Sequence, residues 1–264
     1  MAASTRPCTT FPASPGHPSP MGYHTWSHLL FAHWRVPPES LEPLLPPGLD
    51  IDTMDGDAWV GLVAFHMSNI HPAWFPAVPG ISTFHETNIR TYIRTPSGES
   101  AVWFLSLDAA SWPAVKVARW RWNLPYFHAD MSLVKTDNTV CYASQRRGTD
   151  GLQGRVLLKA SLGEVIRPPA AHPAEAAGFA DNVGELGQYF IDRYTLVTAG
   201  RRNRLLKGQV GHTPYPLRSA RITRLNETLT DALGIPINGR APDHTVFSDG
   251  VDVDIYPLKP LKIH

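Results

Sequence analysis

Apolar residues in this chain gather in short runs that are more typical of strands than of long helices. AWVGLVAF (58–65) carries no polar residue, which predicts a strand covered on both faces. FHETNIRTYIRT (84–95) and AVWFLSLD (101–108) flank the turn signal Thr95-Pro-Ser-Gly98 and predict a hairpin. Further strands are predicted over 139–145, 155–161, 188–197, 209–212 and 251–256.

Helical patterns are fewer, and they are predicted over 38–42, 111–123, 173–187 and 226–233. Ser111 is the predicted N-cap of the second helix, with Pro113 in its first turn, and Asn226 is the predicted cap of the last. The 25 prolines break the chain too often for long helices. Many strands without βαβ alternation predict one α+β domain over 23–264, built mainly on antiparallel sheet.

The first twenty residues contain five prolines, no acidic residue and no apolar stretch. A secretory signal would need a continuous apolar centre, so residues 1–22 are predicted to be a disordered tail rich in Pro, Ser and Thr.

Composition narrows the classes of function. The net charge of +1 argues against a protein whose main task is to bind nucleic acid or an anionic membrane. Two cysteines cannot build a disulfide framework, and no apolar run is long enough for a membrane helix. A cytoplasmic globular protein is predicted; a homo-oligomer is left open.

Known phosphate-binding, nucleophile and zinc-binding motifs are missing from the sequence. It has neither a Walker loop nor GxGxxG, and neither GxSxG nor HExxH. His24, His28 and His33 have a metal-like spacing, but His24 borders the tail and no carboxylate stands nearby. No metal and no cofactor are predicted.

Segment 84–95 carries the most informative polar pattern. The two-residue period of a strand puts four polar side chains on one face: Glu86, Asn88, Arg90 and Tyr92. Such a face is either solvated or the lining of a cavity. The doubly covered strand 58–65 favours an enclosed sheet, in which an arginine could bind a substrate carboxylate.

Three other positions carry candidate chemistry. Asp108 ends a predicted strand, where it can cap the next turn or project into a pocket mouth. His212 lies in a proline-stiffened bend and is either a general acid/base or a buried, hydrogen-bonded core residue. Lys116 stands among tryptophans, where it is either a desolvated nucleophile or a surface lysine with its stem lying on an indole ring.

Taken together, many segments in order resemble the YqjF-like family of uncharacterised bacterial proteins, within the acetoacetate decarboxylase-like superfamily. The segments are LLFAHWRVPPESLEPLLPPGL (29–49), DAWVGLVAFHM (57–67), FHETNIRTYIRTPSG (84–98), VWFLSLDA (102–109), ARWRWNLPYFHADM (118–131), FIDRYTLVT (190–198), GHTPYPLRSA (211–220) and FSDGVDVDIYP (247–257). The resemblance implies a closed, cone-like or barrel-like antiparallel sheet with an internal pocket and a few peripheral helices.

One departure from that superfamily bears directly on chemistry. Its decarboxylases carry Gly-Arg-Glu-x-x-Gly-x-Pro-Lys-Lys, with the first lysine forming a Schiff base. Laid on residues 118–127, Arg119 and Pro125 match, but Tyr126 and Phe127 replace both lysines. A phenol and a phenyl ring cannot form an imine, so amine-catalysed decarboxylation is not predicted.

Two functions remain open. The first is a lyase-, hydratase- or isomerase-like enzyme acting on an oxo or hydroxy acid or a natural-product intermediate. In it Glu86 would be the general acid/base, Arg90 or Arg119 the carboxylate clamp, and Tyr126 the proton donor. The second is a non-catalytic protein that binds a small ligand. Asn88, Tyr92, Asp108 and His212 would add ligand contacts.

With two arginines in reach, Glu86 is predicted to be ionised and paired.

Overall fold

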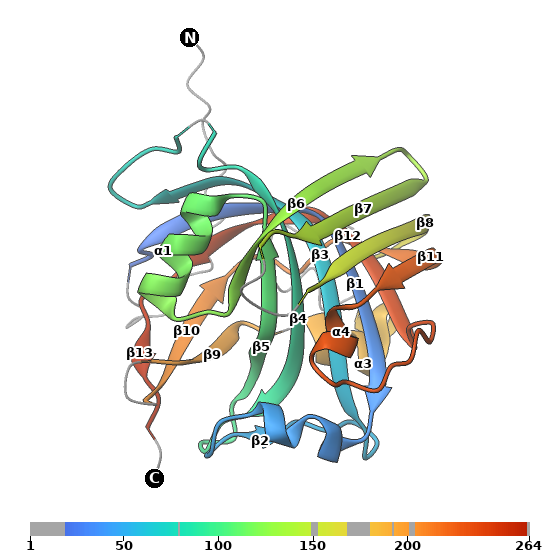
Figure 1. Cartoon of the computed structure of the whole chain (residues 1–264), viewed down its shortest axis with the longest axis horizontal. Coiled ribbons are helices and arrows are strands. Elements are labelled where there is room, and N and C mark those ends of the chain that lie inside the picture. Colours follow the sequence, from blue (N-terminus) through green and yellow to red (C-terminus); the bar gives the residue numbers. More distant parts are fainter. Residues whose placement is uncertain are drawn as a thin grey trace.

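The computed structural model describes residues 19–78, 80–148, 153–167, 180–191, 193–200 and 204–262. Its strands form one 13-stranded sheet, and helix α1 lies at its periphery (Figure 1). The strands are β1 (Gly22–Val36), β2 (Asp50–Ile51), β3 (Ala58–Pro72), β4 (Phe84–Arg94), β5 (Ser100–Ala109), β6 (Tyr126–Lys135), β7 (Thr139–Arg146), β8 (Arg155–Arg167), β9 (Thr195–Ala199), β10 (Leu205–Gly211), β11 (Leu217–Glu227), β12 (His244–Ile255) and β13 (Lys259–Pro260). The helices are η1 (Pro38–Ser40), η2 (Glu42–Leu44), α1 (Trp112–Trp122), α3 (Ala180–Ile191) and α4 (Leu229–Ala232).

The sheet branches at β5, which pairs in parallel with both β6 and β9, while the other pairings are antiparallel. One branch runs β5-β6-β7-β8-β11-β12 and the other β5-β9-β10-β12. Both return through β1, β3 and β4 to β5, so two hydrogen-bonded rings share these strands. We call them the long ring and the short ring. The predicted, mostly antiparallel sheet with few helices is confirmed.

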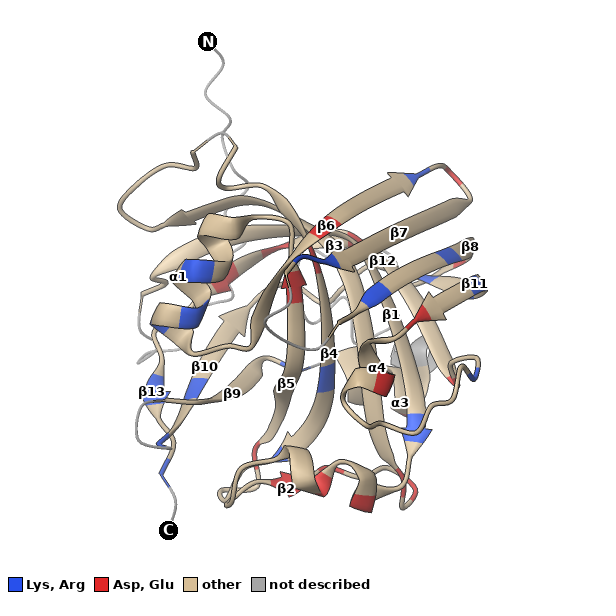
Figure 2. Cartoon of the chain, viewed as in Figure 1, with Lys and Arg blue, Asp and Glu red and all other residues tan. Residues whose placement is uncertain are grey.

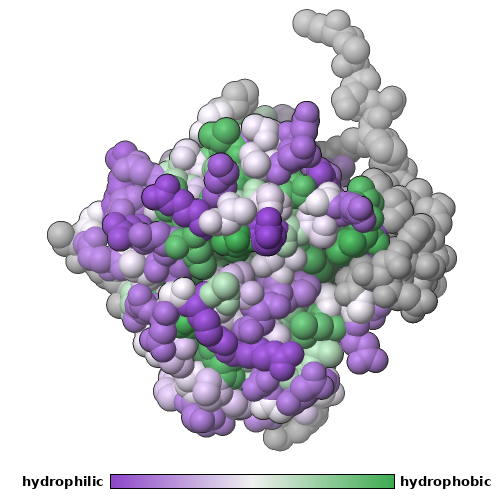
Figure 3. Space-filling model, turned by 90° about the vertical axis from the view of Figure 1, so that its right-hand side faces the viewer, coloured by the Kyte–Doolittle hydropathy of each residue, from purple (hydrophilic) through white to green (hydrophobic). Residues whose placement is uncertain are grey.

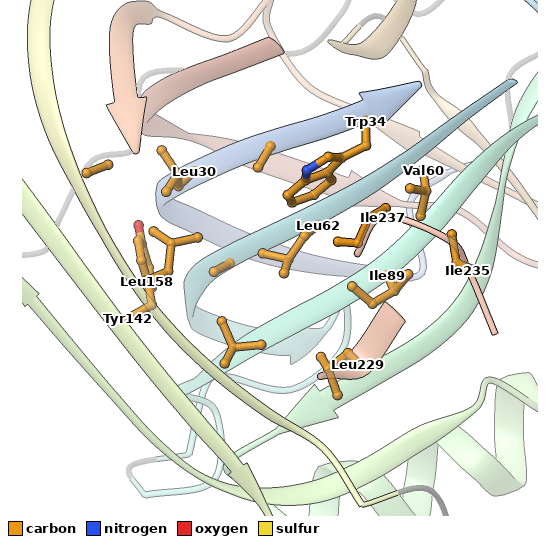
Figure 4. Packing of buried hydrophobic residues seen from close by; sticks show 14 of the residues in the cluster. Leu30, Trp34, Val60, Leu62, Ile89, Tyr142, Leu158, Leu229, Ile235 and Ile237 are labelled. Atoms are coloured by element: carbon orange, nitrogen blue, oxygen red, sulfur yellow. The ribbon is translucent and has the colours of Figure 1, made fainter. Parts of the chain in front are cut away.

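Strand β3 separates the cores of the two rings, and residues 58–65 are buried on both faces as predicted. Val60 and Leu62 pack with residues of β7 and β8 in the core of the long ring, part of which is shown in Figure 4. Trp59 and Val63 point the other way, toward α3 and β12 in the core of the short ring. Alternating side chains of one strand therefore serve two separate cores.

The hairpin of β4 and β5 and the helix capped by Ser111 are also confirmed; the Ser111 hydroxyl accepts from the Ala114 amide at 3.4 Å. Strands β1, β6 and β11 were not predicted. In β1 the register shifts at His28, whose φ is 55°, and this break hides the two-residue period.

Three predictions about local structure were wrong or incomplete. Residues 188–191 are helical, because α3 buries Phe190 and Ile191 against the short-ring core. Segment 38–44 forms two 3₁₀ turns, each with a proline at its start. Asn226 belongs to β11, and α4 is capped by Glu227, whose carboxylate accepts from the Leu229 amide at 2.8 Å and the Thr230 amide at 3.1 Å. Residues 173–179 of the helix predicted over 173–187, and residues 1–18 of the predicted tail, lie outside the described residues; the rest of that helix, 180–187, belongs to α3.

Charged residues of both signs are scattered over strands, loops and α1, without a broad field of one sign in this view (Figure 2). The face in Figure 3 likewise shows small apolar spots broken up by hydrophilic residues. Of the helices in the described ranges, not one has the length and apolar character needed to cross a membrane.

Candidate active site

Glu86, Asn88, Arg90 and Tyr92 share one face of β4, which looks into the short ring. Their antiparallel neighbours on β3 include Phe65 and Val63, which belong to the short-ring core. The polar face is therefore largely buried and not a solvated surface. Its members divide into two groups that lie at opposite ends of the strand.

Glu86 dominates the first group and is only 4% exposed. Its Oε2 accepts a hydrogen bond from the Tyr126 hydroxyl at 2.6 Å, and its Oε1 accepts one from Asn88 Nδ2 at 3.2 Å. Burial raises the pKa of Glu86 to about 7, although both hydrogen bonds oppose the rise. Asn88 Oδ1 is buried and has no hydrogen-bond partner among the described residues.

The expectation that an arginine holds Glu86 ionised is wrong. Among the residues that the structure describes, neither Arg90 nor Arg119 forms a salt bridge with it. Arg119 is exposed on α1, and its Nε donates to the Tyr126 backbone carbonyl at 2.5 Å. Arg90 turns toward the other end of β4. Without a cation, desolvation decides the pKa of Glu86.

Tyr126 opens β6, which places it beside Leu107 of β5 and within reach of Glu86 across the sheet. Burial and the nearby Glu86 carboxylate raise the pKa of Tyr126 well above its usual value. The phenol therefore stays protonated and can donate a hydrogen bond.

Asp108 lies on the opposite face of the sheet, in the long ring. Its Oδ1 accepts from Arg146 Nε at 2.7 Å and its Oδ2 from the Ser144 hydroxyl at 3.1 Å. Both Asp108 and Arg146 are buried, and the guanidinium lies 3.9 Å from the centre of the Phe127 ring. This buried ion pair does not face the Glu86 group.

His212 is buried among aromatic rings, with the centre of Tyr215 at 4.5 Å and that of Trp26 at 6.2 Å. Its Nδ1 donates to the Thr213 carbonyl at 2.7 Å, and burial lowers its pKa to about 4. His212 is thus neutral, with Nε2 as a hydrogen-bond acceptor. Trp26 in turn packs on Phe65, the β3 neighbour of Glu86.

The second group, Arg90 and Tyr92, contacts two histidines that the sequence did not place in this site. Arg90 Nε donates to the Tyr92 hydroxyl at 3.3 Å, and Tyr92 lies 2.7 Å from His33 Nε2. His33 Nδ1 lies 3.1 Å from His244 Nδ1. These four residues come from β4, β1 and β12, so only the fold brings them together. His33 was considered only as a metal ligand, and no three-residue metal group occurs in the described segments.

A surface hollow of about 520 Å³ borders the Glu86 end of β4. Phe84 and His85 line it together with Ser111, Trp112 and His128. Glu86 itself does not line the hollow. Phe84 is its next neighbour on the same face of the strand, so the hollow lies beside the Glu86 group.

The fold resembles that of acetoacetate decarboxylase-like proteins. An acetoacetate decarboxylase-like enzyme from Sphingomonas wittichii RW1 matches with a TM-score of 0.62 and 12% identity, over 97% of this chain and 99% of that one. The enduracididine biosynthesis enzyme MppR, in a complex with pyruvate, matches with a TM-score of 0.59 and 15% identity, over 96% of this chain and 97% of that one.

Comparison of the sequence with known families identifies closer relatives than the solved structures do. Residues 23–252 match the DUF2071 family of uncharacterized conserved proteins. The chain is 33% identical over 235 residues to the uncharacterized protein YqjF of Bacillus subtilis (strain 168), covering 89% of this chain and 90% of that protein. The protein belongs to the DUF2071 family.

Proposed function

We propose that this protein is an enzyme that acts on an oxo or hydroxy acid, or on a natural-product intermediate, by acid/base chemistry at Glu86. The observation that carries the proposal is a buried carboxylate without a cationic partner in the described part of the chain, whose pKa of about 7 suits proton transfer at neutral pH. The structurally similar MppR, which binds pyruvate in its complex, supports a small oxo acid as one class of ligand.

The geometry suggests how the first group would work. Glu86 takes a proton from a carbon next to an oxo group, or from a hydroxyl. Tyr126, freed when Glu86 becomes neutral, turns its hydroxyl toward the substrate oxygen and stabilises the developing negative charge. The unpartnered Asn88 Oδ1 can accept a hydrogen bond from a substrate hydroxyl.

Arg90 is the proposed carboxylate clamp, and its position sets the length of the ligand. Glu86 and Arg90 are four residues apart along β4, so their Cα atoms are about 13 Å apart. The guanidinium points away from Glu86, toward Tyr92 and the Phe190 carbonyl. A ligand that meets both groups must be extended, whereas a three-carbon acid such as pyruvate can occupy only one of the two ends. An internal pocket between the two groups is part of this proposal.

The proposed chemistry uses no Schiff base. Tyr126 and Phe127 carry no amine, and Lys116 is exposed with its ammonium 5.3 Å from the centre of the Trp112 ring. Borohydride reduction in the presence of pyruvate should leave the mass of the protein unchanged. A stable adduct that maps to Lys116 would contradict this and indicate amine catalysis.

The proposal also covers cofactors, localisation and partners. Proton transfer between Glu86, Tyr126 and substrate needs no metal or cofactor. Asp108 takes no part in it. We also propose a cytoplasmic protein that does not bind nucleic acid or membranes, with a homo-oligomer left open.

A screen of oxo and hydroxy acids with the full chain tests the proposal, with Glu86→Gln as the matched variant. Turnover that falls at least about 100-fold in the variant, with kcat/KM changing around pH 7, is the expected result. Equal turnover by both proteins would overturn the role of Glu86. A ligand that copurifies in native mass spectrometry and stays unconverted would instead favour the non-catalytic binding protein.

A further inference from the structure

Four polar side chains form a hydrogen-bonded chain through the short-ring core, away from Glu86. Arg90 Nε lies 3.3 Å from Tyr92 Oη, which lies 2.7 Å from His33 Nε2. His33 Nδ1 lies 3.1 Å from His244 Nδ1. Tyr92 and His33 are fully buried, and the Phe190 ring stacks on His33 with the ring centres 3.8 Å apart. His244 is half-buried at the start of β12.

The direction of each hydrogen bond follows from the donors. Arg90 can only donate, so Tyr92 Oη accepts from it. The Tyr92 hydrogen then has His33 Nε2 as its acceptor, and this requires the proton of neutral His33 to be on Nδ1. His33 Nδ1 donates to His244 Nδ1, which leaves the His244 proton on Nε2. Burial lowers the pKa of both imidazoles, of His244 to about 4, so both are neutral as this pattern requires.

The Arg90 end of this series of hydrogen bonds is suited to binding an anion. The guanidinium is half-buried, faces the Phe31 and Tyr92 rings at 5.5 and 5.6 Å, and has no salt bridge to any carboxylate in the described ranges. Its other hydrogen bond, to the Phe190 carbonyl, is long at 3.4 Å. A guanidinium in such surroundings is normally paired with an anion.

We propose that Arg90 and Tyr92 bind the carboxylate of an organic acid, and that Tyr92, His33 and His244 relay a proton between this ligand and the rim of the short ring. The inference rests on the proposed role of Arg90 as a carboxylate clamp. A bound carboxylate accepts the Tyr92 hydrogen, so Tyr92 Oη must accept from His33 instead. His33 then carries its proton on Nε2 and His244 carries its proton on Nδ1.

The two states hold the same number of protons. To pass from the free to the bound state along the relay, the carboxylic acid form of the ligand gives its proton to Tyr92, and Tyr92 gives its own proton to His33 Nε2. Where the ligand arrives already ionised, as pyruvate does at neutral pH, a water at the same end gives that proton. His33 gives its Nδ1 proton to His244 Nδ1, and His244 releases its Nε2 proton to water. One proton enters at the ligand end, from the neutral acid or from water, and one reaches water at the rim; the reverse sequence returns it.

The test is ¹⁵N NMR of the full chain with labelled histidines, with pyruvate as the probe. In the free protein we expect His33 to be protonated on Nδ1 and His244 on Nε2. Saturation with pyruvate should move the proton to the other ring nitrogen in both histidines together. In Tyr92→Phe, pyruvate should bind about 2- to 10-fold more weakly and should no longer reverse either assignment. Arg90→Gln should weaken binding by roughly 10-fold or more.

A second histidine pair serves as the internal control. His66 and His85 also have their Nδ1 atoms 3.1 Å apart, but they border the surface hollow and are not part of the hydrogen-bonded chain that starts at Arg90. Their signals should not respond to pyruvate. A free protein with His33 protonated on Nε2, or tautomers that pyruvate leaves unchanged, would overturn the relay. Glu86→Gln should leave the switch intact, so loss of the proposed enzymatic function is distinguishable from loss of the relay.

Discussion

Glu86 and Asp108 are buried carboxylates on neighbouring strands of one sheet, and they face different rings. Asp108 pairs with Thr87, the residue next to Glu86, in the β4–β5 register. Glu86 accepts hydrogen bonds from a phenol and an amide, whereas Asp108 accepts them from a guanidinium and a hydroxyl. The two sites therefore differ mainly in the presence of a cation.

Burial raises the pKa of both carboxyl groups, and for Asp108 the Arg146 guanidinium opposes that rise. Arg146 does not lose its proton under ordinary conditions, so Asp108 has a permanent cation beside it, and the pair links β5 to β7. Glu86 has no such partner in the described chain and exchanges its proton near neutrality. The comparison shows that burial alone does not define a reactive carboxylate; the surrounding charges do.

The largest effect is expected from Arg146→Met, which leaves Asp108 buried without its cation. The free energy of unfolding should fall by about 3–5 kcal/mol, as measured by denaturant unfolding at pH 7. The double variant Asp108→Asn/Arg146→Met removes both charges and should recover much of that loss. If the single and double variants were equally unstable, packing and not charge would explain the effect.

Glu86→Gln should change how stability depends on pH. Because the pKa of Glu86 rises from 4.5 to about 7 on folding, its protonated form stabilises the fold below pH 4.5, and this contribution is lost as the pH rises through 7. The wild-type protein should lose roughly 2–3 kcal/mol relative to the variant between pH 4.5 and pH 8. Parallel stability curves for the two proteins would show that Glu86 is not poised near neutrality.

Tyr126→Phe should have the smallest of the three effects. It removes the 2.6 Å hydrogen bond that lowers the pKa of Glu86, so this pKa should move further upward. Unfolding above pH 8 should become easier by about 1–2 kcal/mol, and less so at pH 5, where Glu86 is protonated. A loss of the same size at both pH values would indicate a packing role for the ring.

Local patterns predicted the parts of the site that depend on one strand. The alternation of polar residues in β4 predicted that Glu86 and Asn88 share a face, and the turn after Arg94 predicted the β4–β5 hairpin. The direction of the Arg90 side chain could not be predicted, because its acceptor at Phe190 is 100 residues away. The His33–His244 contact joins residues that are 211 positions apart, and the local hydrophobic periodicity of the sequence cannot predict such a contact.

The two rings also determine where the sheet is open to other molecules. The strand order ends at β13 and β2, each only two residues long, and β13 consists of Lys259 and Pro260. Exposed strand edges are templates for pairing with another chain, and short edges that carry lysine or proline block this pairing. A sheet of this size consequently offers few free backbone groups at its two ends, which should protect the folded protein against edge-to-edge aggregation.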